Sequence, residues 1–302
     1  MSGWIANVWA RPAEARQENV QPFRYVRPEK LDAALALMAE YGPDARVLAG
    51  GTDLLVRLRL GHIRPKLVLD LKRVSALRSD VIEVDSCLRV GARTVITDLL
   101  ADERIRRHYP ALVEAASVVG SIQIRNRATL AGNVCNASPA ADTAPALLVY
   151  RATVNLVGHA GRRNVPLSEF FTGPGTTVLA RGELLESIDL PLAQEPSGAA
   201  FGRITRRRGV DLATINLCCL LTGSGEARVA YGAVAARPFV ITDDSGALAD
   251  RGSSSVARDA AIDRLIAQAA PITDVRGSRE YRLAMLSVMT RRTLQAARER
   301  LA

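Results

Sequence analysis

Apolar and polar residues follow two rhythms over the first part of the chain, one with a period of two and one with helical spacing. The segment FRYVR after Pro22 alternates as a strand does, whereas the apolar residues between Leu31 and Met38 recur on one face of a helix. Gly42 and Pro43 end that helix. The pattern predicts a strand at 22–27, a helix from Leu31 to the Gly42–Pro43 stop, a strand at 46–49, a helical segment at 54–60 and a strand at 67–71, which together form a βαβ-type unit.

From Val81 the pattern changes to hairpins and short helices. VIEVDSCLRVGA, starting at Val81, alternates as a β-hairpin, and Thr97 is placed to cap a helix that starts near Val95. Alternation returns between Leu184 and Pro191. The other elements predicted in this part are a helix at 110–119, a helical turn at 144–150 and a strand at 153–157 that turns through 158–161.

A change of composition at AQEPSG, residues 193–198, marks the best candidate for a linker. The chain beyond it predicts a separate α+β module, in which Ser224 and Gly225 form a hairpin turn. Its predicted elements are strands at 200–205, 213–222 and 227–233 and helices at 253–270 and 278–301. At the other end, the first twenty residues lack periodicity and are expected to form an extension, which contains Trp4 and Trp9.

The stretch from Ser121 to Pro145 fits neither rhythm. Its sequence, SIQIRNRATLAGNVCNASPAADTAP, is dense in small and polar residues, and we expect a loop whose backbone lies directly against a ligand. The alternative is a loop that bonds only its own backbone through Asx and Ser turns. Asp142 suits a ribose or an adenine donor better than a phosphate. The positions that carry this prediction are Thr129, Gly132, Asn133, Asn136, Ser138 and Asp142.

A second glycine turn, AGGTD at residues 49–53, follows a predicted strand and precedes a helical segment. This order directs backbone N–H groups and the positive end of a helix dipole at the turn, where an anion is the natural ligand. Thr52 adds a hydroxyl donor. The turn alone is weak evidence, because it is neither a P-loop nor a GxGxxG motif and similar turns serve as plain connectors. We expect this turn and the 121–145 stretch to form one ligand site.

Composition and charge exclude several other functions. The 302 residues carry a formal charge of +9, but aromatic residues make up only 4% and no basic stripe with a nucleic-acid-binding fold is visible, so we expect no nucleic acid partner. The four cysteines lack CxxC spacing, which argues against a metal site and for a reducing compartment. The longest apolar run, 212–221, is too short to cross a bilayer, and no signal peptide is visible. These observations predict a cytoplasmic protein without a membrane span.

The sequence contains no motif for hydrolytic or metal chemistry. His62, His108 and His159 stand apart from any Cys or carboxylate at ligand spacing, and GxSxG, HExxH and Cys/His pairings are missing. We therefore name no catalytic acid, base or nucleophile and no metal ligand. RITRRRGVD, at 203–211, reads as a solvated basic turn, unless it faces the ligand site, where one Arg would meet an anionic or electron-rich ring.

Two long motifs in a fixed order resemble those of a known family. AGGTDLL, followed by QIRNRATLAGNVCNASPAAD, resembles the FAD-binding (medium) subunit of the molybdenum hydroxylases, such as xanthine dehydrogenase and carbon monoxide dehydrogenase. FRYVRP and VPLSEFFTGPG look like the same family, and the resemblance extends from Phe23 to the C-terminus. It implies an α+β fold: an extension at 1–20, a PCMH-type (vanillyl-alcohol-oxidase-like) FAD-binding domain at 21–193 with two α/β sub-domains at about 21–78 and 79–193, and a smaller C-terminal α+β domain at 198–302.

The resemblance also assigns residues to the cofactor. The 47–54 segment would wrap the FAD pyrophosphate and approach the isoalloxazine edge, and the 129–133 segment would hold the pyrophosphate and ribityl region from the other side. Asn136 and Ser138 would add polar contacts, and Asp142 would bond the adenosine portion. Leu185 would pack on the flavin or adenine end, and Arg203 stands where the family commonly has Lys near the ring. The implied set is Val47, Leu48, Ala49, Gly50, Gly51, Thr52, Asp53, Leu54, Thr129, Leu130, Ala131, Gly132, Asn133, Asn136, Ser138, Asp142, Leu185 and Arg203.

The sequence departs from the family's pattern at two of these positions. Ala131 replaces a glycine of the usual Thr-Ile-Gly-Gly-Asn and adds a Cβ where the backbone is expected to approach the cofactor, which is tolerable if its φ is negative. Arg203 keeps the charge of Lys but changes its shape. The four-Cys insertion of the 4-hydroxybenzoyl-CoA reductase branch is absent, so we expect no iron–sulfur cluster on this chain. No His occupies the position of covalent attachment, so the FAD is expected to be non-covalent.

The implied function is electron transfer within a complex. A large subunit would carry the molybdenum cofactor and oxidise the substrate, a small subunit would carry two [2Fe–2S] clusters, and FAD on this chain would pass the electrons to NAD+, oxygen or another acceptor. The implied assembly is a dimer of heterotrimers. Two alternatives are a stand-alone, MurB-like flavoenzyme, for which we find no Ser/Glu acid–base pair, and an FAD-free scaffold subunit, for which Ala131 is the one local indication.

Overall fold

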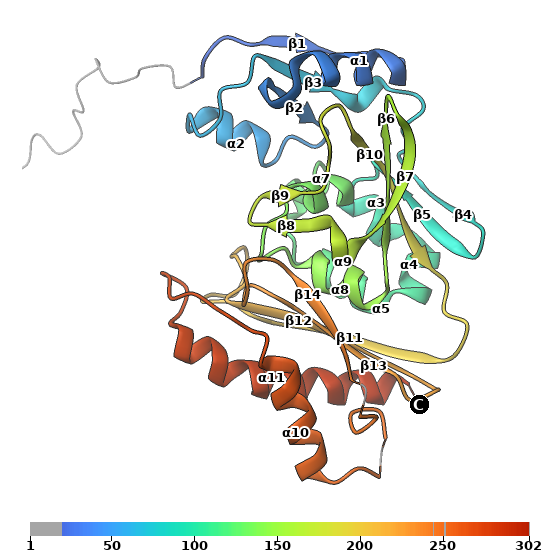
Figure 1. Ribbon diagram of the computed structural model, residues 1–302, viewed down its shortest axis with the longest axis vertical. Coiled ribbons are helices and arrows are strands. Elements are labelled where there is room, and N and C mark those ends of the chain that lie inside the picture. Colours follow the sequence, from blue (N-terminus) through green and yellow to red (C-terminus); the bar gives the residue numbers. More distant parts are fainter. Residues whose placement is uncertain (1–19, 244, 251, 302) are drawn as a thin grey trace, which may run out of the picture.

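The computed structural model describes residues 20–243, 245–250 and 252–301. Three β-sheets follow one another along the long axis of the molecule, with helices between and beside them (Figure 1). The first sheet has three strands, the second five and the third four, and a two-stranded hairpin stands apart from them. Strands and helices are therefore mixed throughout, as the predicted α+β class requires.

The first sheet is parallel and has the strand order β1-β3-β2. Its strands β2 and β3 are joined through a helix, as the predicted βαβ-type unit requires, and the buried Leu67 and Leu69 of β3 pack against Ala34 and Leu35 of α1. The AGGTD turn leaves the carboxyl end of β2, which is the edge where parallel sheets bind ligands. The elements are β1 (Arg24–Val26), α1 (Leu31–Tyr41), β2 (Ala45–Leu48), α2 (Leu54–Arg59) and β3 (Leu67–Asp70), with 3₁₀ turns at Gly42–Asp44 and Leu71–Arg73.

The second sheet is antiparallel and has the strand order β4-β5-β10-β6-β7. Strand β10 lies at its centre, and Arg89 of β5 is ion-paired across the register with Asp189 of β10. A bulge separates Leu185 from Ser187 where β10 meets β6. The strands are β4 (Val81–Val84), β5 (Cys87–Gly91), β6 (Thr153–Gly158), β7 (Gly161–Pro166) and β10 (Leu184–Pro191), and the separate hairpin is β8 (Phe171–Gly173) with β9 (Thr176–Thr177).

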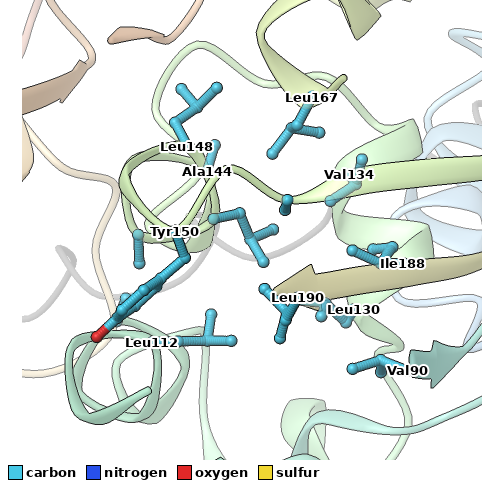
Figure 2. Close-up of a cluster of buried hydrophobic side chains, with 14 of the residues drawn as sticks. Val90, Leu112, Leu130, Val134, Ala144, Leu148, Tyr150, Leu167, Ile188 and Leu190 are labelled. Atoms are coloured by element: carbon cyan, nitrogen blue, oxygen red, sulfur yellow. The ribbon is translucent and has the colours of Figure 1, made fainter. Parts of the chain in front are cut away.

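Helices pack against this sheet to form the largest core. Figure 2 shows Leu130 and Val134 of α7 beside Ile188 and Leu190 of β10, with Leu112 of α5 at the same cluster. The helices are α3 (Ile96–Ala101), α4 (Glu103–His108), α5 (Pro110–Ser117), α6 (Ile122–Arg125), α7 (Leu130–Cys135), α8 (Thr143–Val149) and α9 (Leu167–Phe170).

The prediction of a loop over residues 121–145 is wrong, because that stretch forms α6, α7 and the start of α8. Short helices carry too little periodicity to be read from a sequence, and here side-chain caps define them. The Ser121 hydroxyl accepts from the Ile124 N–H at 3.3 Å, and the Thr129 hydroxyl accepts from the Gly132 N–H at 3.0 Å. The predicted cap at Thr97 is also wrong: Val95 precedes the helix, and the Thr97 hydroxyl bonds the Asn126 side chain instead.

The third sheet is antiparallel with the order β11-β12-β13-β14. Helices α5 and α8 contact it from the second sheet's side, and α11 crosses its opposite face (Figure 1). Gly198 lies directly under α11, where a Cβ would be 2.1 Å from the Ala297 carbonyl oxygen. Strand β14 was not predicted. The elements are β11 (Ser197–Ile204), β12 (Ile215–Thr222), β13 (Ala227–Gly232), β14 (Phe239–Asp243), α10 (Ser255–Ile266) and α11 (Arg279–Arg300).

Specific hydrogen bonds join the second and third sheets. The Glu114 carboxylate on α5 accepts from the Phe201 N–H of β11 at 3.0 Å and from the Arg300 guanidinium at the end of α11. The Ala233 N–H donates to the Pro139 carbonyl, 2.7 Å away in the turn between α7 and α8. The third sheet therefore fixes the position of the polar turn that follows α7.

Three expectations from the sequence concern the N-terminal extension, a membrane span and a metal site. The predicted extension, 1–20, with Trp4 and Trp9, lies outside them except for its last residue. Across 20–243, 245–250 and 252–301, no helix is both long and apolar enough to cross a membrane. Over the same ranges, no group of three or more His, Cys, Asp or Glu side chains is arranged to hold a metal ion.

Candidate functional site

A cavity of about 650 Å³ lies between the loops of the first sheet and the helices of the second. Both glycine-containing stretches singled out in the sequence line it, one from each side. The predicted site residues on its wall are Val47, Ala49, Gly50, Gly51, Thr52, Asp53, Leu54, Thr129, Ala131, Gly132, Asn133, Asn136 and Leu185.

The AGGTD turn presents backbone donors to this cavity. Gly51 has a φ of +81°, a conformation that L side chains rarely adopt, and α2 begins at Leu54, directly after the turn. Within the described chain, the N–H groups of Thr52 and Asp53 have no hydrogen-bond acceptor. Unpaired N–H groups at a helix start form a concave site for an anion.

The opposite wall is the first turn of α7. Thr129 caps this helix, so its hydroxyl is turned toward the Gly132 N–H. Ala131 lies within α7 and is not among the described residues with positive φ, so its Cβ is accommodated without backbone strain. The Asn133 side chain accepts from the Thr143 hydroxyl at 2.7 Å, which fixes its amide beside the cavity.

The two walls touch each other at one end of the cavity. A Cβ on Gly50 would lie 2.0 Å from the Arg127 carbonyl oxygen and 2.9 Å from the Ala128 Cα, so only glycine allows the backbones to meet. The Asn136 amide also donates to the Asp53 carboxylate at 3.4 Å. These contacts fix the first sheet's turn against α7.

Five predicted site residues are not on the cavity wall. Leu130 is fully buried in the core beside β10 (Figure 2). Leu48 lies beneath the AGGTD turn, where its Cδ1 would contact a Cβ on Gly51. The Ser138 hydroxyl accepts from the Ala140 N–H at 3.3 Å. The other two, Asp142 and Arg203, are described next, and the cofactor contacts expected for all five stay predictions.

Asp142 and Arg203 form a buried pair between the second and third sheets. The Arg203 Nε is ion-paired with the Asp142 carboxylate at 3.3 Å, and this carboxylate accepts a hydrogen bond from the Asn216 amide at 2.8 Å. The Arg203 Nη2 donates a hydrogen bond to the Asp211 carbonyl. Burial raises the pKa of Asp142 to about 6, against the opposing effect of the Asn216 hydrogen bond and the Arg203 charge. The pair therefore links the turn after α7 to β11 and β12.

This pKa predicts a pH-dependent stability that Asp142→Asn removes. The folded pKa exceeds the ordinary value of 3.8, so the favourable contribution of protonated Asp142 is complete below about pH 4 and is lost as pH rises through about 6. Between pH 4 and pH 7 the unfolding free energy of the wild type should decrease by up to about 3 kcal/mol more than the unfolding free energy of Asp142→Asn does over the same range. Urea unfolding at each pH measures the difference, and parallel profiles for the two proteins would contradict it.

Sequence reasoning missed the residues at the other end of the cavity. They come from the end of α1 and the turn after it, from β2, and from the turn that leads into β10, and the signals in the sequence were the Gly42–Pro43 stop and the glycine at 182. Arg181 lies there, where its Nε donates to the Ala39 carbonyl at 3.1 Å and its Nη2 to the Glu40 carbonyl at 3.2 Å. The missed residues at this end are Met38, Gly42, Pro43, Arg46, Leu179, Ala180, Arg181, Gly182, Glu183 and Leu184.

Arg181 bridges the two walls across this end of the cavity. It extends from the turn before β10 to the last carbonyls of α1, which carry the negative end of the helix dipole. Gly42, with φ +49°, leaves room for it, because a Cβ there would lie 2.6 Å from the Arg181 Nε. The cavity is thus closed at one end by the Gly50 contact and bridged at the other by Arg181.

Two protein families match the chain, one after the other. Residues 21–193 match the family described as the FAD binding domain in molybdopterin dehydrogenase, and residues 200–297 match the CO dehydrogenase flavoprotein C-terminal domain. The chain belongs to the molybdopterin dehydrogenase FAD-binding family. The suspected resemblance, the α+β fold class and the expectation of an oxidoreductase subunit that binds FAD are therefore confirmed.

Similar proteins extend over almost the whole chain. The xanthine dehydrogenase FAD-binding subunit of Escherichia coli O157:H7 is 33% identical over 278 residues, covering 90% of this chain and 95% of its own length. The carbon monoxide dehydrogenase medium chain of Hydrogenophaga pseudoflava is 33% identical over 281 residues, covering 91% and 96%. A structure of carbon monoxide dehydrogenase from H. pseudoflava, which lacks the Mo-pyranopterin moiety of the molybdenum cofactor, superposes with a TM-score of 0.86 at 31% identity and covers 94% of this chain and 99% of that one.

Proposed function

We propose that this chain holds one FAD non-covalently in the cavity between its first and second sub-domains. The observation that carries the proposal is that both glycine-containing motifs line one cavity of about 650 Å³ with unpaired backbone donors on one wall. Apolar Leu54 at the start of α2 and Leu185 on β10 also line the cavity and suit an aromatic ring system. The residues that line the site therefore fit the polar centre and the planar ends of FAD.

Each wall has a distinct proposed role. Backbone N–H groups of the 50–53 turn bind the pyrophosphate, with the dipole of α2 behind them. The first turn of α7, from Thr129 to Asn133, binds the cofactor from the opposite side, and Asn136 fixes Asp53 at the junction. FAD itself supplies the redox chemistry, accepting and releasing electrons singly or in pairs.

Non-covalent binding agrees with the state of the one thiol on the cavity wall. Cys135 lines the cavity, but burial raises the pKa of its thiol to about 12, which keeps it protonated and a poor nucleophile. Among the described residues, no His lines this cavity. The side chains around the site therefore position the flavin without attaching it.

We propose further that the flavin transfers electrons within a complex. A partner subunit with two [2Fe–2S] clusters delivers them, a large subunit with the molybdenum cofactor oxidises the substrate, and NAD+, oxygen or another acceptor removes them. The support is the family membership and the names of the relatives, which are medium chains and FAD-binding subunits of dehydrogenases. The chain needs no acid or base of its own for this role, and a dimer of heterotrimers is the proposed assembly.

The decisive experiment is an absorption spectrum of the purified chain. Flavin absorption bands, at about 370 and 450 nm for any flavin, should stay with the protein through gel filtration. If acid precipitation then releases the flavin into the supernatant, the result would support bound, non-covalent FAD. A chain that shows no bands after incubation with excess FAD would instead be the scaffold subunit. Co-purification of molybdenum- and iron-containing chains separates a complex from a stand-alone flavoenzyme.

The bridge made by Arg181 predicts a specific effect on cofactor retention. Arg181→Met removes two hydrogen bonds between the cavity walls, each worth about 0.5–1 kcal/mol at this exposed site. FAD should dissociate about fivefold faster, measured as fluorescence recovery after dilution, while the spectrum of bound FAD stays the same. Arg162→Met, which removes the ion pair between Arg162 of β7 and Glu186 of β10, is the control and should leave the rate unchanged. Equal rates for all three proteins would show that Arg181 does not retain the cofactor.

A further inference from the structure

The basic turn between β11 and β12 takes no part in the wall of the cofactor cavity. None of the residues from 204 to 212 lines that cavity. The turn lies at one end of the third sheet (Figure 1), where Arg206, Arg207 and Arg208 are all exposed. Its one acidic side chain, Asp211, is only 5% exposed and is ion-paired with Arg206 at 3.2 Å. The turn therefore presents positive charge to solvent without an exposed carboxylate of its own.

A second connection lies against this turn. The Arg206 Nη1 donates to the Val275 carbonyl at 3.4 Å, and the Thr214 hydroxyl donates to the Arg276 carbonyl at 3.3 Å. Both carbonyls belong to the segment that joins α10 to α11. Residues 206–212 and 272–281 therefore form one continuous surface, which we call the loop patch.

The loop patch exposes large apolar side chains. Val275 is 87% exposed and Ile272 is 67% exposed, so both protrude with little contact to the rest of the chain. Val210, Leu212 and Tyr281 are 53%, 56% and 45% exposed. Exposed apolar side chains that gather on one surface mark an interaction site, whereas single ones do not. The loop patch thus combines apolar side chains with exposed arginines.

We infer that the loop patch binds the surface of an anionic lipid bilayer. The protruding aliphatic side chains enter the headgroup region, where their burial is favourable. Arg207 and Arg208 attract the anionic lipids, and the Tyr281 phenol suits the boundary between the apolar and the polar layer. Such peripheral contact needs no membrane-spanning helix, and it does not require FAD in the cavity.

Other occupants fit the loop patch less well. A protein partner of fixed shape would need a pocket for each protruding side chain, whereas a bilayer needs none. Nucleic acid would pair with the arginines but gains little from the aliphatic side chains, and Tyr281 is the only aromatic residue in 206–212 and 272–281 that could stack on a base. In a symmetric dimer the arginines of the two copies would face one another.

The test is flotation of the purified full chain with lipid vesicles. Vesicles of phosphatidylcholine alone are compared with vesicles that also contain phosphatidylglycerol. The patch variants are Ile272→Ser with Val275→Ser, and Arg207→Gln with Arg208→Gln. Matched controls are Val256→Ser on α10, which is 77% exposed, and Arg106→Gln with Arg107→Gln on α4, which removes two adjacent exposed arginines elsewhere (Figure 1).

The wild type should float with the anionic vesicles and not with the neutral ones, and added salt should release it. Loss of the two arginines should weaken binding about thirtyfold and loss of the two aliphatic side chains about tenfold, whereas both controls should bind as the wild type does. Unchanged thermal midpoints would show that the variants are folded, as expected for exposed positions.

Three results would overturn the inference. The first is a wild type that does not float with anionic vesicles, and the second is equal loss of binding in the patch variants and the controls. The third is a protein that co-purifies with the wild type and is lost from both patch variants while no chain floats, which would assign the loop patch to a protein partner.

Discussion

Replacement of Gly50 by alanine is expected to open the cavity and abolish FAD binding. The new Cβ would lie 2.0 Å from the Arg127 carbonyl oxygen, whereas ordinary contacts begin at 3.4 Å, so the backbones must separate by about 1.4 Å. Both partners are backbone atoms, so no side chain can rotate away to relieve the clash. The cost in unfolding free energy should be about 3 kcal/mol or more, the upper range for overpacking. Thermal unfolding and the flavin absorbance of the purified variant measure the two effects.

Gly223→Ala is the matched control for this substitution. Gly223 lies in the hairpin between β12 and β13, its φ is not positive, and the nearest atom to a Cβ there is 3.6 Å away. This variant should keep both its stability and its FAD. If Gly50→Ala also retained wild-type FAD content, the close contact between the AGGTD turn and α7 would not be required for the site.

Replacement of Arg282 by methionine should destabilise the packing of α11 on the third sheet by about 3–5 kcal/mol. Arg282 is 2% exposed and donates to the Thr214 carbonyl at 3.1 Å, the Ala233 carbonyl at 2.7 Å and the Asp274 carboxylate at 2.6 Å. Methionine fills much of the same volume but removes the donor from the Thr214 and Ala233 carbonyls, whereas Asp274 keeps its ion pair with Arg276. Because Ala233 in turn donates to Pro139, the turn after α7 should loosen as well.

Urea unfolding of the whole chain, followed by circular dichroism, measures this loss. Arg292→Met lies on the same helix α11 but is exposed, so it provides a control that should remain within about 0.5 kcal/mol of the wild type. Limited proteolysis would add a local readout, with cleavage around the third sheet and α11 appearing first in Arg282→Met. Identical midpoints for the two variants would mean that the buried hydrogen bonds of Arg282 contribute nothing net.

Long, regular elements of the fold were predictable from the sequence, and short ones were not. Strand β12 buries a continuous apolar run, and helix α11 buries residues that recur at helical spacing. Both patterns are visible in the sequence without knowledge of the tertiary structure. Helices α6 and α7 span only four and six residues and depend on caps at Ser121 and Thr129. The same polar residues that define these caps made the stretch look like a loop.

The cavity was predictable only where motifs form its wall. The glycines in AGGTD predict that the backbone of this turn packs closely against another group. In the structure that turn contacts the backbone just before α7. Arg181 carries no such signal, because its partners are carbonyls of Ala39 and Glu40, more than a hundred residues earlier in the chain. Likewise, Leu130 sits within a motif yet points into the core, which a motif cannot reveal.

The central position of β10 determines when the cavity can exist during synthesis. Strand β5 can pair with β10, its second neighbour in the sheet, only after Asp189 has been synthesised, 100 residues after Arg89. At about 5–20 residues per second, a ribosome needs roughly 5–20 s to supply them, and during that time β5 has an unpaired edge open to other chains. Leu184 and Leu185, which complete the cavity wall, also arrive at the end of that interval. Flavin capture is therefore a late event in the synthesis of the chain, because the cavity is complete only after β10 has emerged.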